Sequence, residues 1–222
     1  MKTEEESIQA DHVRVLGEEA GRYYNHLYRQ LVLMHVILRE LRMLLRILTG
    51  EIDVDASLRK RFFRMIWGSY GRDLIHGISA LADPAVDGHF NNISLKGLMT
   101  MLGKRGVVSC AFKQALIEFN EVAAPVGTYR NKHLAHFDAK TILRLPTSDV
   151  TTTLDQIAEC LTKAAAVLNT VEREHFKNSC VIYTKPWVPP GGIETVISML
   201  ELYEKYVAGL LAVEKPKRKK KA

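Results

Sequence analysis

The sequence predicts an all-α protein, a single-domain bundle of about six helices. Apolar residues recur at helical spacing along most of the 222-residue chain, and no segment shows the alternating pattern that is typical of a strand. With 47% hydrophobic residues, the chain is also long enough to bury a core without disulfides or a metal ion. We therefore expect residues 1–213 to form one helical domain and residues 214–222 to form a disordered basic tail.

The first long helix is expected between Tyr24 and Gly50, because glycine ends the periodic pattern there. Its apolar seam consists of Leu27, Leu31, Met34, Leu38, Leu41, Leu45 and Leu48. Further apolar residues widen this face, namely Leu33, Val36, Ile37 and Leu44. A face this wide indicates a helix that packs on two sides, against its own bundle and against a second copy of the chain.

A second helix is expected from about Asp55 to Ala82, ended by Asp83 and Pro84. Its apolar side holds Leu58, Phe62, Met65, Ile66, Trp67, Leu74, Ile75, Ile78 and Leu81. The aromatic residues also lie among arginines, as in a strip that stacks bases and binds phosphate: Phe62, Phe63, Trp67 and Tyr70 beside Arg59, Arg61 and Arg64. Of the two interpretations we favour an aromatic core face.

The helices that follow are placed by their caps and breakers. Residues 83–92 are of types that are typical of turns. Ser94 is then expected to cap a short helix that runs through Leu102 and is closed by Gly103. The motif region, residues 109–139, is expected to begin a helix near Ser109, which Pro125 kinks or restarts. Two further helices are expected over residues 149–177 and 193–213.

The positive charge is concentrated at one end of the sequence. Residues 214–222 hold six Lys/Arg and one acid, so this tail carries +5 of the formal +6 and residues 1–213 carry only +1. A basic run of this kind is attracted to polyanions. Two interpretations stay open: a solubilising tail without a specific ligand, or a nuclear-import signal or tethering arm for nucleic acid.

Cysteine usage and the N-terminus favour a cytoplasmic protein. Cys110, Cys160 and Cys180 are far apart and show no C-x-x-C spacing, so neither a disulfide framework nor a zinc site is indicated. The first residues are acidic, unlike a signal peptide, and no run approaches the roughly 18 apolar residues that a membrane span requires. We expect no membrane partner.

The candidate catalytic residues are concentrated between Thr128 and Asp138, where polar residues alternate with a few apolar residues that can anchor the segment to the core. On an α-helix Arg130, His133 and His136 would form one ridge of i, i+3 neighbours. Mutual repulsion of their positive charges would hold both histidines toward the neutral form. A neutral His136 can take the proton of a ribose 2′-hydroxyl while Arg130 stabilises charge on the phosphate.

This mechanism requires no cofactor and no metal, and the segment offers no metal ligand set. Asn131 is expected to orient a catalytic partner or the phosphate, and Lys132 and His133 are expected to contact RNA. On an ideal α-helix, Arg130 and His136 are about 120° apart around the axis and about 9 Å apart along it. Two copies across a two-fold axis would close that gap, so we expect a homodimer.

The motif resembles that of the HEPN superfamily, helical ribonuclease and nucleotide-binding domains with an Arg, often followed by Asn, Asp or His, and a His after four to six further residues. Arg130, Asn131 and His136 match it, with five residues between Arg and His. The spacing also fits Arg29 and His35, where we interpret His35 as a packing histidine in the first long helix.

The surroundings of the motif resemble the abortive-infection branch of this superfamily. The matching segments are Tyr-Arg-Asn-Lys-His-Leu-Ala-His-Phe-Asp at 129–138, Leu-Ala-Asp-Pro at 81–84 and Asn-Ile-Ser-Leu at 92–95. The resemblance implies an all-α fold, a homodimer and a composite site that faces RNA. It predicts a metal-independent endoribonuclease of a phage-defence or toxin-like system, with a neutralising antitoxin as an open partner. Two alternatives remain, a non-catalytic RNA- or nucleotide-binding HEPN module and a helical scaffold or regulatory protein.

Overall fold

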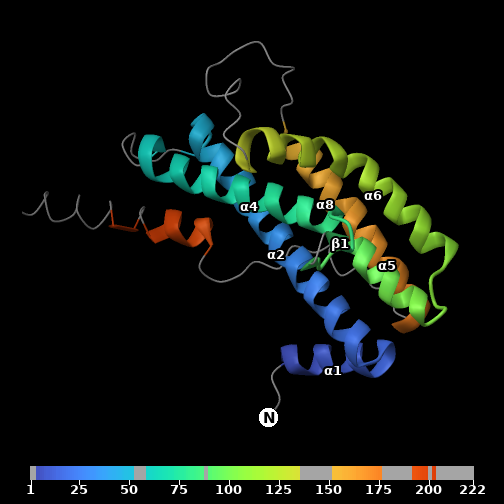
Figure 1. The fold of residues 1–222 in the computed structure, drawn as a ribbon. Coiled ribbons are helices and arrows are strands. Elements are labelled where there is room, and N and C mark those ends of the chain that lie inside the picture. The colour runs from blue at the N-terminus through green and yellow to red at the C-terminus, as the bar shows by residue number, and fades with distance from the viewer. Residues whose placement is uncertain are drawn as a thin grey trace, which may run out of the picture.

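The computed structural model describes residues 4–52, 59–87, 90–135, 152–176, 192–199 and 202–203. Within these residues the chain is a helical bundle, which confirms the predicted all-α fold (Figure 1). The α-helices are α1 (Glu4–Leu16), α2 (Glu18–Thr49), α4 (Arg64–Ala82), α5 (Leu95–Lys104), α6 (Cys110–Tyr129) and α8 (Leu154–Val171). Three π-helical turns adjoin α4, α6 and α8: η1 (Arg59–Phe63), η2 (Arg130–Ala135) and η3 (Glu172–Phe176).

Helix α2 is the central element, and α1, α4, α5 and α8 all pack against it. It ends as predicted, because Gly50 adopts the left-handed conformation at φ 84° that closes a helix. The predicted seam is buried from Leu27 to Leu41. Beyond Leu41 the predicted seam is wrong at Leu45, which is 40% exposed, whereas Leu48 is partly buried against the core. Leu44, which belongs to the predicted wider face, and Ile47 are fully buried.

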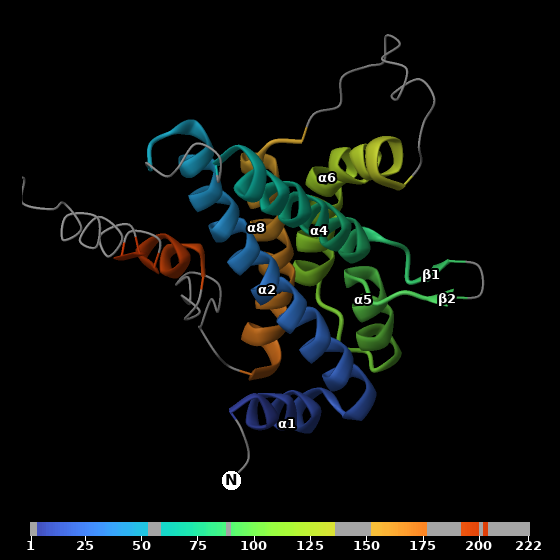
Figure 2. The ribbon, with the colours of Figure 1, turned by 90° about the vertical axis from the view of Figure 1, so that its left-hand side faces the viewer.

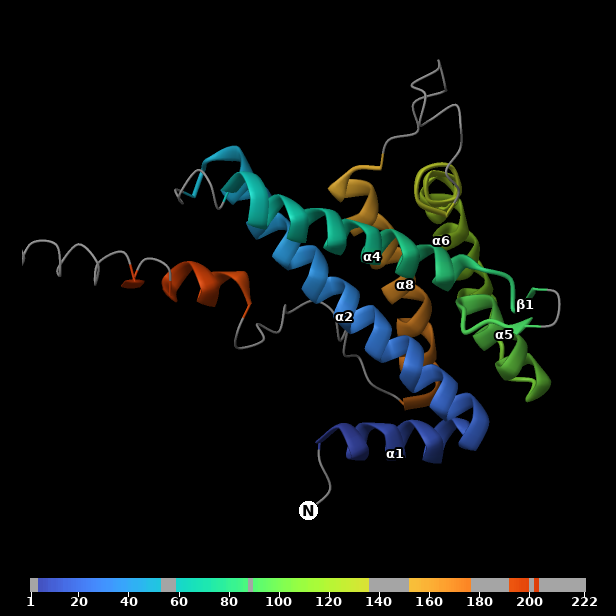
Figure 3. The same cartoon turned by 60° about the vertical axis from the view of Figure 1, so that its left-hand side comes forward.

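Helix α1 was not expected from the sequence and lies across the end of α2 (Figure 3). The two helices meet at Gly17, whose φ of 79° is unfavourable for other residues. Gly21 faces α1 so closely that a Cβ there would lie 2.5 Å from Val13 Cα. This close approach buries Leu16 and His12 against α2.

A short antiparallel pair of strands, β1 (Val86–Asp87) and β2 (Phe90–Asn91), follows α4, where the sequence predicted only turns (Figure 2). Tyr23 of α2 fixes the exit from this hairpin: its hydroxyl donates to Asn92 O at 2.7 Å and accepts from Ser94 N at 2.8 Å. A two-residue strand is too short to show an alternating pattern, so periodicity could not reveal it.

The predicted cap of α5 is confirmed, and α6 begins near Ser109 as predicted, with Ser109 as its cap. Ser94 Oγ accepts from Gly97 N at 3.1 Å, and Ser109 Oγ accepts from Phe112 N at 3.0 Å. Gly103 does not close α5, because the helix continues to Lys104 and the left-handed glycine is Gly106.

Helices α6 and α8 pack side by side along much of their length. Pro125 does not restart α6, which continues through it to Tyr129. Helix α8 begins at Leu154, later than predicted, because Thr153 and Gln156 form a capping box there. The α-helix ends at Val171, and η3 continues the chain to Phe176.

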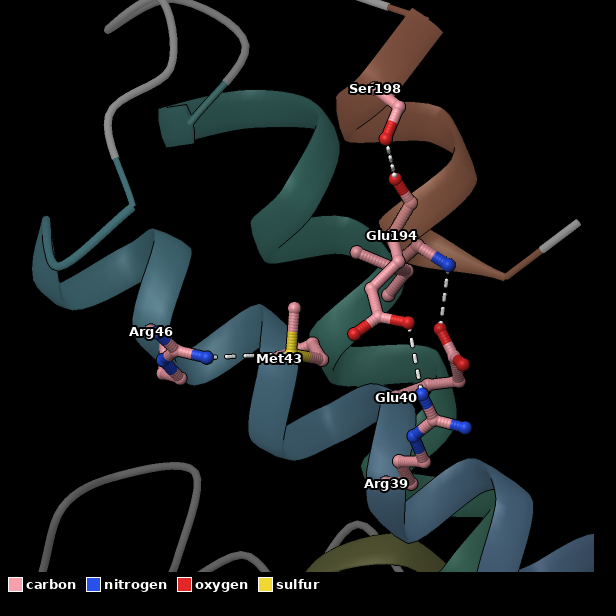
Figure 4. Close-up of polar contacts among 7 residues, drawn as sticks. Arg39, Glu40, Met43, Arg46, Glu194 and Ser198 are labelled. Carbon is pink, nitrogen blue, oxygen red and sulfur yellow. Dashed lines mark hydrogen bonds and ion pairs between the residues drawn. The ribbon is translucent and has the colours of Figure 1, made fainter. Parts of the chain in front are cut away.

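A helix over residues 193–199 begins where the sequence predicted and docks on α2 (Figure 4). Glu40 Oε2 accepts from Ile193 N at 2.7 Å, and Arg39 donates to Glu194 Oε2 at 2.9 Å. Ile193 and Ile197 are buried in the core beneath this contact. The predicted basic tail and Cys180 lie outside the described residues.

The described residues contain no helix that is both long and apolar enough to cross a membrane.

Candidate active site

The motif begins in η2, the π-helical turn that continues α6. The N–H of Arg130 bonds back to Gly127 O and Val126 O, so the turn grows directly from the last residues of the helix. Tyr129 and Leu134 pack against the hydrophobic core on either side of the polar residues. These two anchors hold Arg130 at the end of α6, and the neighbouring Asn131 side chain is exposed.

Two side chains position the Arg130 guanidinium. Its Nη1 lies 3.6 Å from Asp83 Oδ1, and its Nε donates to Asn131 Oδ1 at 3.2 Å. Arg130 and Asp83 are 26% and 33% exposed, so the pair is only partly desolvated. Nη2 has no hydrogen-bond partner among the described residues, which leaves it free to donate to an anion.

Asp83 lies in the candidate site, although the sequence did not predict it as a site residue. It ends α4, and its backbone N–H bonds to Ala80 O. The sequence predicted that Asp83 ends a helix, and residues 81–84 resemble the abortive-infection branch of the HEPN superfamily. Neither observation showed that Asp83 faces Arg130. The ion pair joins the end of α4 to the turn after α6.

The predicted i, i+3 ridge is wrong over residues 130–135, because this turn is π-helical. In a π-helix the backbone hydrogen bonds link residues i and i+5 and widen the turn. The predicted ridge and the predicted 120° separation of Arg130 and His136 both assume an α-helix. That assumption does not hold where the motif begins.

The structure brings together only part of the predicted site. Arg130 and Asn131 are in contact, and Lys132 is half-buried beside them in the chain. For His133 only the backbone is described, and His136 lies outside the described residues. The roles given to these side chains therefore stay predictions.

The second pair with HEPN-like spacing lies within α2. His35 is half-buried, and desolvation lowers its pKa, with a smaller contribution from the positive charge of Arg42. Arg29 is exposed. The half-buried position fits the interpretation of His35 as a packing residue.

Metal-ligating residues are not clustered in the part of the chain that the structure describes: no group of three or more His, Cys, Asp or Glu could hold an ion there. Cys160 is buried between α8 and α6, where its thiol donates to Val122 O at 3.2 Å. Burial raises the pKa of this thiol to about 11 and keeps it protonated.

The sequence matches the family model HEPN_AbiU2, described as AbiU2, over residues 17–190. This span includes α2, the helix terminator Asp83, Arg130 and His136. No curated protein and no solved structure matches the chain. Because the match covers well over half of the residues and agrees with the all-α fold, the chain belongs to AbiU2, a HEPN-type abortive-infection family.

Proposed function

We propose that the protein is a metal-independent endoribonuclease of a phage-defence or toxin-like system. The observation that supports this function best is the guanidinium of Arg130, held by Asp83 and Asn131 with Nη2 directed to no described partner. An oriented arginine with spare donors is suited to the charge that develops on a phosphate during in-line displacement.

In the proposed reaction, His136 takes the proton of a ribose 2′-hydroxyl. The 2′-oxygen then attacks the adjacent phosphorus, the bond from phosphorus to the 5′-oxygen breaks, and a general acid protonates that leaving oxygen. One product ends in a 2′,3′-cyclic phosphate and the other in a 5′-hydroxyl. Arg130 stabilises the phosphorane, Asn131 orients Arg130, and Lys132 and His133 hold the RNA backbone.

A second copy of the chain is proposed to complete the site. Leu33 of α2 is 57% exposed and Ile117 of α6 is 52% exposed, so both helices offer apolar surface outside the bundle. Burial of such surface favours association between subunits. Light scattering at micromolar concentration is expected to show a dimer, and a monomer would contradict the composite site.

The function is tested with purified protein and a structured RNA in the presence of EDTA, with the ends of the products mapped. Arg130→Ala and His136→Ala are each expected to slow cleavage by about a hundredfold or more, because each removes a group that acts in the transition state. Arg64→Ala and His26→Ala are matched controls, because both residues are exposed and lie outside the motif. A 2′-deoxy sugar at the cut site should abolish cleavage.

Equal cleavage by the wild type and the double variant would mean a contaminating nuclease and would contradict the catalytic proposal. Stoichiometric binding of RNA without turnover would favour the non-catalytic HEPN module instead. Truncation after Glu214 is expected to weaken RNA binding and to flatten its salt dependence, because six positively charged side chains and no acidic one lie beyond that point.

A further inference from the structure

A cavity of about 660 Å³ lies beside the motif turn, between α2, α4 and the start of α8. Its volume falls within the range that small-molecule sites occupy. Tyr129 and Leu134, which flank the first residues of the motif, form part of its wall. The apolar lining consists of Leu41, Leu45, Ile75, Leu154 and Ile157.

Two arginines line this cavity, Arg42 from α2 and Arg72 from α4. Both are exposed, and neither forms an ion pair with a carboxylate in the described part of the chain. Within the described residues Arg72 donates a long hydrogen bond, of 3.4 Å, to Ser69 Oγ. Two guanidinium groups outnumber the single carboxylate among the described lining residues, that of Asp155, so the cavity attracts an anion such as a phosphate.

The wall that α4 contributes is partly aromatic. Trp67 is half-buried and lines the cavity together with Gly68 and Gly71. A Cβ added at either glycine would meet no atom within 4 Å, so packing inside the chain does not require a glycine there. Glycine in a helix interior also weakens the helix, so the two glycines need another explanation. A planar group that stacks beside the Trp67 indole would occupy the space next to Gly68 and Gly71 and so explain why no side chain fills it.

Polar groups from the start of α8 complete the cavity. Thr152 Oγ1 is shielded from solvent and has no hydrogen-bond partner among the described residues. The exposed carboxylate of Asp155 lines the same cavity and can accept a hydrogen bond from a hydroxyl group or an amine. A bare phosphate would leave both groups unused, whereas a sugar hydroxyl satisfies them.

We propose that this cavity binds one nucleotide of a single-stranded RNA. The base stacks on Trp67, the phosphate lies at Arg42 and Arg72, and the ribose faces Thr152 and Asp155. The proposal rests on the proposed function, since it gives the RNA substrate a base-binding subsite. Because Tyr129 and Leu134 belong both to the cavity wall and to the motif segment, the neighbouring nucleotide of the strand passes next to Arg130.

The subsite can be tested without measuring catalysis, through the fluorescence of Trp67. Trp187→Phe leaves Trp67 as the single tryptophan. Titration with the four 5′-mononucleotides is expected to quench this fluorescence saturably, whereas inorganic phosphate should bind at least tenfold more weakly because it has no base to stack.

Arg42→Gln and Arg72→Gln, made in the single-tryptophan background, are each expected to weaken nucleotide binding at least tenfold. Arg64→Gln is the matched control, because Arg64 is an exposed arginine of α4 that does not line the cavity. Gly71→Leu should fill the cavity and abolish binding while raising the melting temperature, since leucine favours a helix. This variant separates loss of the site from loss of the fold.

Absence of saturable quenching would overturn the proposal, as would equal binding by inorganic phosphate or equal losses in Arg64→Gln and Arg72→Gln. The proposed nuclease function can fail separately. Arg130→Ala is expected to slow cleavage by about a hundredfold or more and to keep the quenching of Trp67. Saturable quenching in a protein that never cleaves RNA would support the subsite and contradict only the proposed reaction.

Discussion

Asp83 Oδ1 lies 3.6 Å from Arg130 Nη1 and so joins the end of α4 to the turn after α6. Both side chains are partly exposed, and ion pairs in such positions contribute about 0–1 kcal/mol to stability. The distance is long for a hydrogen bond, so Asp83 attracts the guanidinium without occupying its donors fully. The contact therefore matters more for the direction of Arg130 than for the stability of the fold.

Replacement of Asp83 by Asn is expected to lower RNA cleavage about tenfold and to change the melting temperature little, because it removes the charge that orients Arg130. Asp83→Glu should restore part of the activity, since it returns the carboxylate. Asp73→Asn is the control, because Asp73 is an exposed carboxylate of the same helix. Equal cleavage by Asp83→Asn and the wild type would contradict a positioning role.

Pro125→Ala is expected to stabilise the protein by about 1–3 kcal/mol. Pro125 is exposed within the continuous helix α6, and it cannot donate the backbone hydrogen bond that Glu121 O would accept from it. Thermal unfolding measures the change, with Lys113→Ala as an exposed control on the same helix. A lower melting temperature would show that the proline ring contributes packing, and loss of cleavage at raised stability would show that a bend at Pro125 directs Arg130.

Local signals in the sequence predicted the helices well. The seam of α2, the serine cap of α5 and the start of α6 near Ser109 depend on residues a few positions apart, so a single stretch of sequence contains all the information. The sequence also contains the signal for the start of α8, because Thr153 and Gln156 have the spacing of a capping box, but the turn residues before them favour an earlier start.

Features that depend on distant residues could not be predicted in the same way. Helix α1 has only a few apolar residues, and its position depends on the close approach of Gly21. The contact between Asp83 and Arg130, and the cavity that Arg42 shares with Trp67, combine different helices. The π-helical form of the turn at Arg130 has no known signature in the residues of the motif themselves.

Glu40→Ala is expected to release the helix over residues 193–199 from α2. The Glu40 carboxylate is buried, and it accepts the backbone N–H of Ile193 at the start of that helix (Figure 4). Its removal leaves this N–H without its partner, at a cost of about 1–3 kcal/mol. Hydrogen exchange should therefore become faster over residues 193–199 and stay slow in the centre of α2.

Arg46→Ala is the matched control for Glu40→Ala, because Arg46 is an exposed residue of α2 that pairs with Glu51 and not with the docked helix. Arg39→Ala should have a smaller effect than Glu40→Ala, since the pair of Arg39 with Glu194 is partly exposed. Unchanged exchange over residues 193–199 in Glu40→Ala would show that Ile193 and Ile197 alone hold the helix.

Acidification is expected to destabilise the protein through two histidines. His12 is 5% exposed, and its Nδ1 lies 3.0 Å from Asn25 Oδ1. Desolvation lowers its pKa and outweighs the opposing effects of Asn25 and of the Glu172 carboxylate 3.9 Å from Nε2. The pKa of His35 is lowered for the same main reason.

The sign of the effect follows from which state binds the proton. Below pH 6.5 the unfolded chain protonates both histidines, while the folded protein resists protonation of His12 and His35 because of their lowered pKa values. The contribution of the neutral His12 and His35 to stability is therefore fully present above the histidine pKa of the unfolded chain. It is lost progressively as the pH falls below that value. The melting temperature should decline between about pH 7.5 and pH 5.5, before most carboxylates titrate.

His12→Gln is expected to start from a lower melting temperature, because it disturbs the buried contact with Asn25, but to decline less steeply over this pH range. His35→Gln should remove a further part of the slope. The control is His26→Gln, since His26 is exposed. If His12→Gln and His26→Gln show the same slope as the wild type, protonation of His12 does not couple to folding. In that case the loss on acidification must come from other groups.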